Sequence, residues 1–290
     1  MKLQVFKHAV IRPTTWSEAR SLFLEKRGWI FRGQRETSWH LETTIQRVVG
    51  TKDGVGPEVA LLLEFQRRAH HYISVCDLPG QDDILEWLAL MQHHGCPTRL
   101  LDFTRSPFVA AYFALIDATG DSAVWAINPA WLMEQAYETV SVKAAGVDVG
   151  TTMDWQQFKR LFFERIDPFV LAIEPFHTNE RLSVQQGLFL MAGLPYVSLE
   201  DNFMRAKYTD IETNVQRIDL VASYRKEALL ELDLMNINAA SLFPGLDGFA
   251  ASLRQWIDFL PDYLKRRECI SMGLPRSDRP MNELSSPTTK

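Results

Sequence analysis

The chain has 290 residues, of which 46% are hydrophobic and 23% are charged. This composition is too apolar for a disordered protein, and the length allows a core that needs no disulfide or metal ion to hold it. The formal net charge of -5 excludes a surface that attracts nucleic acid or anionic lipid over its whole extent, although a local basic groove stays compatible with it.

Two features of the sequence bear on its compartment. The first residues lack the apolar core of a signal peptide, and no later apolar run reaches the ~20 residues of a membrane span, so we expect a cytoplasmic protein with no membrane partner. The three cysteines, Cys76, Cys96 and Cys269, lie outside any CxxC spacing. Their odd number and wide separation argue against a disulfide framework or a zinc–thiolate cluster and fit a reducing compartment.

Helix and strand signals alternate along the first part of the chain. Thr15 and Glu18 have the spacing of a capping box, and Ser106 followed by Pro107 has the pattern of an N-cap and a first helical residue. In chain order, the apolar patterns and breakers predict a helix over 15–27, a strand over 29–31 that leads into Arg32-Gly33-Gln34, a helix from Pro57, a helix from Asp82 or Asp83 to Gly95, a strand over 98–103 and a helix from Pro107 to Ile116.

The second part continues the alternation. Its predicted elements are a strand over 123–127, a helix over 154–166, a strand over 169–173, a strand over 215–221, a helix over 224–234 and a last helix that Asp247 can cap. We therefore expect one α+β domain over residues 1–274, with a mixed or antiparallel central sheet flanked by helices. The polar, Pro/Ser-rich residues 275–290 are expected to form a disordered tail.

Three segments place polar residues between apolar flanks, where the fold would bring them into or beside the core. They are Phe31–Gln34, Gln92–Pro107 and Arg181–Phe189. The first two make the chain resemble the FRG domain family, which is named for an aromatic-Arg-Gly motif and has a second motif close to QHHGxPTRLLDWTxSP. Gln92–Pro107 matches that second motif almost throughout, with Phe103 where the family usually has Trp.

The resemblance to the FRG domain family extends over about residues 28–250. Further matches to the family pattern are Trp39-x-Leu41, Ala110-x-Tyr112-Phe113-Ala114, Gln185-Gln186-Gly187-x-Phe189 and Leu242–Asp247. The order of the motifs is also similar, more weakly, to that of ADP-ribosyltransferases. Those enzymes have a strand with Arg or His, then a strand that ends in Ser/Thr or Tyr before a helix, and then a late strand with Glu.

The second resemblance implies NAD as the substrate and a set of site residues. Arg32 and His94 would hold the dinucleotide, Thr104 would orient the ribose, and Gln186 would support bond cleavage as the fourth catalytic residue. Ser106 could take the place of Thr104 as the hydroxyl. The expected cofactor-binding residues around this set are Gly33, Gln34, His93, Arg99, Asp102, Ser106 and Gln185.

Gln186 departs from the transferase pattern, because a neutral amide cannot stabilise positive charge as a carboxylate does. Another group would have to compensate, and the candidates by motif are Glu180, Asp102 and Glu174. Without such a group, the site would have lost its catalytic activity. His93 and His94 could bind the pyrophosphate or move a proton near neutral pH.

Each of these polar residues also has a purely structural interpretation. Arg32 could form a buried ion pair with Asp102, and His94 could cap the C-terminus of its helix. One of Thr104 and Ser106 is expected to be the N-cap of the following helix. Gln185 and Gln186 could be hydrogen-bonded amides at a sheet edge.

The leading function is therefore an NAD-binding, ADP-ribosyltransferase-like enzyme that transfers ADP-ribose to a protein or nucleic-acid acceptor or cleaves NAD. By analogy, a bacterial toxin or antiphage effector with an antitoxin as partner would be a natural setting. The first alternative is a non-catalytic module that binds a nucleotide or a protein. The second is a metal-dependent hydrolase or nuclease that uses His93, His94 and Asp102, with His70 or His71 as a further ligand. Adjacent histidines on a helix diverge by ~100 degrees, so we expect no metal site.

Overall fold

The computed structural model describes residues 6–50, 56–139, 143, 155–164 and 167–259. The chain divides into two compact units, Met1–Asn238 and Ala239–Lys290. The predicted tail, residues 275–290, lies outside the described residues, as does Cys269.

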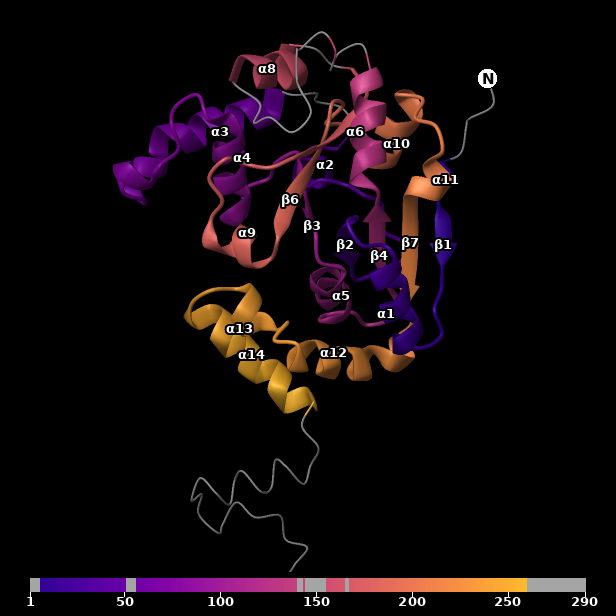
Figure 1. The fold of residues 1–290 in the computed structure, drawn as a ribbon. Helices are drawn as coiled ribbons and strands as arrows, with labels where there is room; N and C mark the ends of the chain where they lie inside the picture. The colour runs from indigo at the N-terminus through magenta and orange to yellow at the C-terminus, as the bar shows by residue number, and fades with distance from the viewer. Residues whose placement is uncertain (1–5, 51–55, 140–142, 144–154, 165–166, 260–290) are drawn as a thin grey trace, which may run out of the picture. The chain divides into compact units, whose positions relative to one another are not determined.

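A seven-stranded mixed sheet forms the centre of the first unit in the part of the chain that is described (Figure 1). Its strands are β1 (Ala9–Ile11), β2 (Ile30–Gln34), β3 (Leu100–Thr104), β4 (Ser122–Ile127), β5 (Val170–Ile173), β6 (Gly187–Ala192) and β7 (Val215–Leu220). They lie in the order β1-β7-β4-β2-β3-β6-β5. β1 and β7 are parallel, and the remaining neighbours are antiparallel. The α+β class with one mixed sheet is therefore confirmed.

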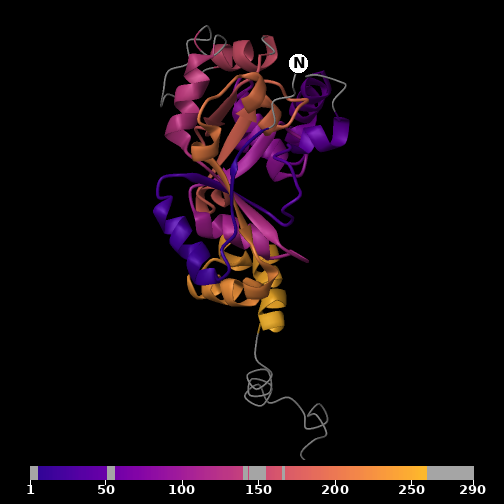
Figure 2. The same ribbon diagram turned by 90° about the vertical axis from the view of Figure 1, so that its right-hand side faces the viewer.

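Helices cover both faces of this sheet. Those of the first unit are α1 (Trp16–Glu25), α2 (Thr44–Val49), α3 (Gly56–Arg68), α4 (Ile84–His93), α5 (Pro107–Leu115), α6 (Pro129–Glu138), α8 (Trp155–Lys159), α9 (Glu180–Val184), α10 (Leu199–Arg205), α11 (Ile211–Asn214) and α12 (Arg225–Leu234). A π-helical turn, Arg160–Glu164, follows α8. In the view of Figure 2, α1 and α3 lie on opposite sides of the strands. The second unit contains α13 (Ala239–Leu242) and α14 (Leu246–Phe259).

Most predicted helix starts are found, with differences in how they are capped. The Thr15 hydroxyl accepts from the Glu18 N–H, but the Glu18 carboxylate accepts from Thr14, so the expected reciprocal capping box is shifted by one residue. Asp83 precedes α4, but its carboxylate accepts from Gly80 and leaves the helix end uncapped. α6 was not predicted, although Asn128 followed by Pro129 is the same signal as Ser106-Pro107.

The two faces of β2 have different partners, because successive side chains of a strand point to opposite sides. Phe31 points to the α1 and α5 side, where the Phe23 ring stacks edge-on against it with 6.5 Å between centroids. Gly33 points the same way, and a Cβ there would lie 2.0 Å from the Ala110 carbonyl oxygen of α5. The glycine therefore allows α5 to pack directly on β2. Arg32 and Gln34 point to the other face.

Candidate functional site

A cavity of about 730 Å³ is lined by residues from all three polar segments of the sequence, a volume in the usual range of small-molecule sites. Its walls come from β2, the loop to α2, the end of α4, β3, and the α9–β6 corner. The polar residues of the lining are Arg32, Gln34, Arg35, Ser38, His40, Glu42, Arg47, Gln92, His93, Asp102, Thr104, Asn179, Arg181 and Gln185. Segments far apart in the sequence thus converge on one hollow.

Arg32 enters this cavity from β2 with a side chain that is 18% exposed. Its Nη1 donates to the backbone carbonyl of Asp102 at 2.7 Å, whereas the Asp102 carboxylate lies 3.8 Å away. Its Nε is buried and has no partner among the described residues. Burial lowers the pKa of Arg32, Asp102 opposes this, and the nearby positive charge of Arg47 lowers the pKa further. The expected pair with Asp102 is thus mainly a bond to its main chain.

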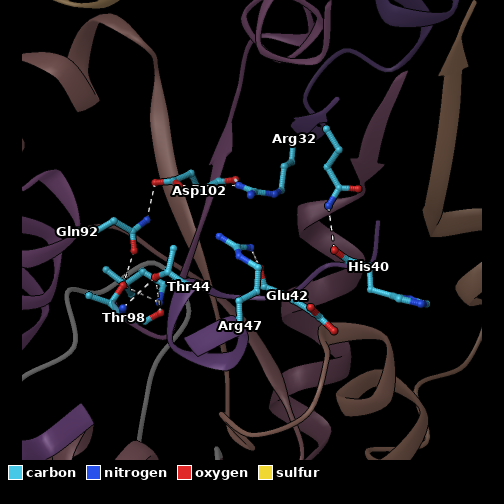
Figure 3. Close-up of polar contacts among 10 residues, drawn as sticks. Arg32, His40, Glu42, Thr44, Arg47, Gln92, Thr98 and Asp102 are labelled. Atoms are coloured by element: carbon cyan, nitrogen blue, oxygen red, sulfur yellow. Dashed lines mark hydrogen bonds and ion pairs between the residues drawn. The ribbon is translucent and has the colours of Figure 1, made fainter. Parts of the chain in front are cut away.

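The Asp102 side chain is held from the opposite direction. Its Oδ1 accepts from Gln92 Nε2 at 2.7 Å, and the side-chain oxygen of Gln92, Oε1, accepts from the Thr98 hydroxyl (Figure 3). Thr98 in turn exchanges hydrogen bonds with Thr44, at 2.9 Å from its N–H and 3.1 Å to its carbonyl. This chain of bonds fixes the carboxylate in place while 64% of the side chain remains exposed.

Arg47 on α2 extends toward the same space as Arg32 (Figure 3). Its Nη1 donates to the Glu42 backbone carbonyl at 2.8 Å. Both guanidinium groups are thus held by neutral carbonyls, and neither has a carboxylate within hydrogen-bond distance among the described residues. Arg35, also in the lining, pairs with Asp117 at 3.0 Å. With Arg181, the lining holds four arginines against the two acids Glu42 and Asp102, which gives a positive site in an acidic protein.

Gln34 and Gly33 line the cavity but have structural tasks. The Gln34 amide accepts from the Trp125 indole at 2.8 Å and donates to the His40 carbonyl at 3.0 Å, so both of its polar ends are engaged. Gly33 is required by the close approach of α5. Both residues therefore shape the cavity wall, and their expected role in binding a cofactor stays a prediction.

Thr104 and Gln185 lie together at the end of β3. The Thr104 hydroxyl donates to the Gln185 carbonyl at 2.7 Å and accepts from the Ser106 N–H at 3.0 Å. Ser106 is the N-cap of α5, where its hydroxyl accepts from the Val109 N–H at 3.3 Å, and it is outside the lining. The two alternatives for the cap are thereby resolved in favour of Ser106, and Thr104 joins the second polar segment to the third.

Arg99 was expected to bind the cofactor and instead belongs to the core. It is completely buried, forms an ion pair with Glu58 on α3, and donates to the Phe162 carbonyl at 3.0 Å. Leu100 and Leu101, which follow it, are the first residues of β3 and are buried, so Arg99 lies at a strand start inside the core. The expectation was wrong because a motif shared across a family also contains residues that only hold the fold.

His94 and Gln186 also lie outside the lining, contrary to their expected catalytic roles. His94 is the exposed C-cap residue of α4, as its structural interpretation predicted. Gln186 is exposed, has a left-handed backbone with φ 49°, and accepts from the Arg105 N–H at 3.0 Å through its carbonyl. Glu174 pairs with Arg105, and Glu180 lies in the first turn of α9, so neither carboxylate is in the lining.

His93 is the last residue of α4 and does line the cavity. Desolvation by burial, together with the neighbouring His94 and Arg181, lowers the pKa of His93 below its usual value. The ring is therefore neutral near pH 7 and can accept or donate a hydrogen bond without adding charge.

Sequence reasoning missed several residues of the lining. Arg47 and Glu42 flank the start of α2, which was not predicted although Thr43 and Gln46 form a complete capping box there. Trp39 was noted only as part of the family pattern, and Arg181 only as the start of the third segment. Apolar periodicity could not indicate any of them, because they lie on loops and short helices at the rim.

Within the described residues, no group of three or more His, Cys, Asp or Glu side chains is close enough to hold a metal ion. In the same part of the chain, no helix combines the length and the apolar character that crossing a membrane requires. Partial burial raises the pKa of Cys96, which lies outside the cavity lining, so its thiol stays protonated at neutral pH.

Comparison with protein-family models matches the FRG domain over residues 27–122. No curated protein and no solved structure matches the chain. The matched segment runs from the turn before β2 to the start of β4, and it includes Arg32, Gly33, Arg47 and the whole of Gln92–Pro107. Residues 27–122 therefore match the FRG domain, and both sequence motifs of the family contribute residues to the cavity wall.

Proposed function

We propose that the cavity binds NAD and that the chain is an ADP-ribosyltransferase-like enzyme. The observation that carries this proposal is the pair Arg32 and Arg47, two guanidinium groups that extend into one space. Among the described residues, only backbone carbonyls are within hydrogen-bond distance of them. Guanidinium groups bind phosphate oxygens through paired, charge-assisted bonds. A diphosphate between them would offset their mutual repulsion.

The placement of the motifs in the sheet supports a transferase. Arg32 is on β2, Thr104 ends β3 just before α5, and Gln186, the residue of the third element, immediately precedes β6. β2, β3 and β6 are neighbours in the sheet, so the three elements in the motif order of ADP-ribosyltransferases stand side by side. Thr104 and Gln185 are in direct contact.

The proposed reaction breaks the bond between the nicotinamide nitrogen and C1′ of the ribose, and the electron pair leaves with nicotinamide. A nucleophile of the acceptor, or water, forms the new bond to C1′ and loses a proton. Positive charge develops on the sugar in between, which a carboxylate can stabilise. We assign this role to Asp102, because it lies in the cavity beside Arg32, unlike Gln186, Glu174 and Glu180.

A non-catalytic nucleotide-binding module is the second candidate. It is favoured by the third motif element, where Gln185 and Gln186 are both neutral amides and no carboxylate of α9 or β6 lines the cavity. The same positive lining would hold a nucleotide without cleaving it. Binding and turnover therefore have to be measured separately.

The test is calorimetric titration of the full chain with NAD and with ADP-ribose, followed by chromatographic detection of released nicotinamide. We expect binding by the wild type and at least a ten-fold loss of affinity in Arg32→Ala and Arg47→Ala, since each removes a charge-assisted phosphate contact. Arg67→Ala is the matched control, because Arg67 is an exposed arginine on α3 that pairs with Glu64 outside the lining.

Three outcomes are distinguishable. Binding with nicotinamide release supports the enzyme. Binding of NAD and ADP-ribose without any release supports the module and overturns the transferase. Absence of binding by the wild type to either nucleotide overturns both.

A further inference from the structure

Trp39 differs from the other tryptophans whose side chains are described. Four of those are buried and donate their indole N–H, namely Trp16 to Glu231, Trp87 to Gly80, Trp125 to Gln34 and Trp131 to Thr209. Trp29 has the Lys26 ammonium 4.6 Å from its ring centre. Trp39 is 46% exposed, and the described residues provide neither a hydrogen bond for its indole nor a stacked ring.

The loop that carries Trp39 is nevertheless well anchored. Leu41, two residues further on, is completely buried. Its N–H donates to the buried Glu200 carboxylate at 2.9 Å, and its carbonyl accepts from Leu199 at 3.1 Å. Between Trp39 and Leu41, the His40 carbonyl accepts from the Gln34 amide at 3.0 Å. The main chain around Trp39 is therefore fixed on the core while Trp39 itself is 46% exposed. This exposure is unfavourable for so large an apolar surface unless a ligand covers it.

The ring also lies in the cavity that holds the two guanidinium groups. Trp39, Arg32 and Arg47 all line it, and Phe113 adds a further aromatic side chain to the wall. A nucleotide has both kinds of group that such a lining would recognise. Its phosphates suit the arginines, and the flat face of its base suits an exposed indole.

We propose that Trp39 is the stacking platform for the heteroaromatic ring of a nucleotide whose phosphates lie between Arg32 and Arg47. The inference rests on the proposed function in one respect, namely that the cavity takes a nucleotide. It goes further by assigning recognition of the ring to a residue outside the transferase motif order. It also predicts that ring recognition and phosphate recognition can be separated by mutation.

The experiment compares affinities for ADP, nicotinamide mononucleotide and inorganic pyrophosphate in the wild type, Trp39→Ala and Trp39→Phe. For Trp39→Ala we expect about a ten-fold or greater loss of affinity for at least one of the two nucleotides, and pyrophosphate binding within about two-fold of the wild type. Trp39→Phe, which keeps an aromatic face, should recover most of that loss. Tyr72→Ala is the matched control, since Tyr72 is 86% exposed and lies outside the lining.

The nucleotide that loses affinity identifies the ring that stacks. Unchanged binding of both nucleotides in Trp39→Ala overturns the stacking role and leaves the proposed function intact. An equal loss for pyrophosphate and nucleotides also overturns it, because the substitution would then act through the loop. If the wild type binds none of the nucleotides, the proposed function and this inference fall together.

Discussion

The guanidinium of Arg32 is hydrogen-bonded to the main chain of Asp102, with 2.7 Å between Nη1 and the carbonyl oxygen, and it is 3.8 Å from the carboxylate of the same residue. The backbone of β3 therefore positions the arginine. The carboxylate is held separately by Gln92. A substitution of the Asp102 side chain can thus remove the acid without releasing Arg32.

Asp102→Asn should separate binding from chemistry. We expect ADP-ribose to bind at least as tightly as in the wild type, because the variant removes a negative charge from a cavity for an anionic ligand. Nicotinamide release should fall about a hundred-fold or more, since the charge that supports the developing cation is lost. Steady-state release and calorimetry measure the two effects, with the exposed Asp77→Asn as control. Unchanged release would remove Asp102 from the mechanism.

Gly33→Ala should destabilise the fold. The added methyl group would lie 2.0 Å from the Ala110 carbonyl oxygen and 2.6 Å from the Ala114 nitrogen, both of them backbone atoms of α5. Relief requires α5 to move from β2, and we expect a loss of about 2 kcal/mol or more in the free energy of unfolding by urea. Gly120→Ala is the control, because nothing lies within 4 Å of a Cβ at that position. Equal stability of the two variants would contradict the packing role of Gly33.

The buried ion pair of Glu58 and Arg99 offers a second test of stability. Glu58→Gln leaves the guanidinium of a completely buried arginine without its counter-charge. We expect a loss of about 3 kcal/mol in urea unfolding. Glu64→Gln on the same helix is the matched control, and it should change stability by less than about 0.5 kcal/mol because Glu64 is exposed. Similar losses of unfolding free energy in Glu58→Gln and Glu64→Gln would show that burial does not determine how much the Glu58–Arg99 ion pair contributes to stability.

Glu200 predicts a pH dependence of stability. Desolvation by burial raises the pKa of Glu200 above its usual value, against the hydrogen bond from Leu41 and the charge of His40. The folded state therefore holds this proton more tightly than the unfolded state does. The stabilisation of the folded state by protonated Glu200 is fully present below about pH 4.3, the pKa of an unperturbed glutamate. It is lost as the pH rises through the raised pKa of the folded state. The free energy of unfolding of Glu200→Gln, relative to that of the wild type, should therefore increase as the pH rises from about 4 to about 7.

Glu18 provides the control of opposite sign. Hydrogen bonds from Thr14 lower the pKa of Glu18, so its contribution is present above the unperturbed value and is lost as the pH falls. Urea unfolding from about pH 3 to 7 should give differences from the wild type with opposite slopes, with that of Glu18→Gln below about pH 4.3 and that of Glu200→Gln above it. Parallel slopes would contradict the assignment for Glu200.

The sequence predicts the elements of this fold better than the contacts between them. Apolar periodicity and Pro or Gly breakers locate β2, β3, α4 and α5 within a few residues. The register of the sheet does not follow from those patterns, because pairing depends on side chains that are distant along the chain. For this reason the sequence predicted that Arg32 contacts Asp102, but not that the hydrogen bond is to the main-chain carbonyl of Asp102.

The site was predictable where a motif residue reaches the cavity, as for Arg32, His93 and Asp102. It was not predictable where a motif residue serves the core, as for Arg99, or caps a helix, as for Ser106. Trp39 and Arg47 could not be singled out because their distinguishing property is exposure into the cavity, which depends on the tertiary structure.

The stretch from β2 to α5 holds both recognition motifs and is still not a self-sufficient piece of protein. β2 takes β4 as one neighbour and β3 takes β6, and both partners come later in the chain. A fragment cut after α5 would expose two unpaired strand edges and would lack Arg181 and Gln185 from its ligand wall. If the segment from β2 to α5 is transferred to another protein, we therefore expect it to aggregate. A transferable domain needs the chain through β7.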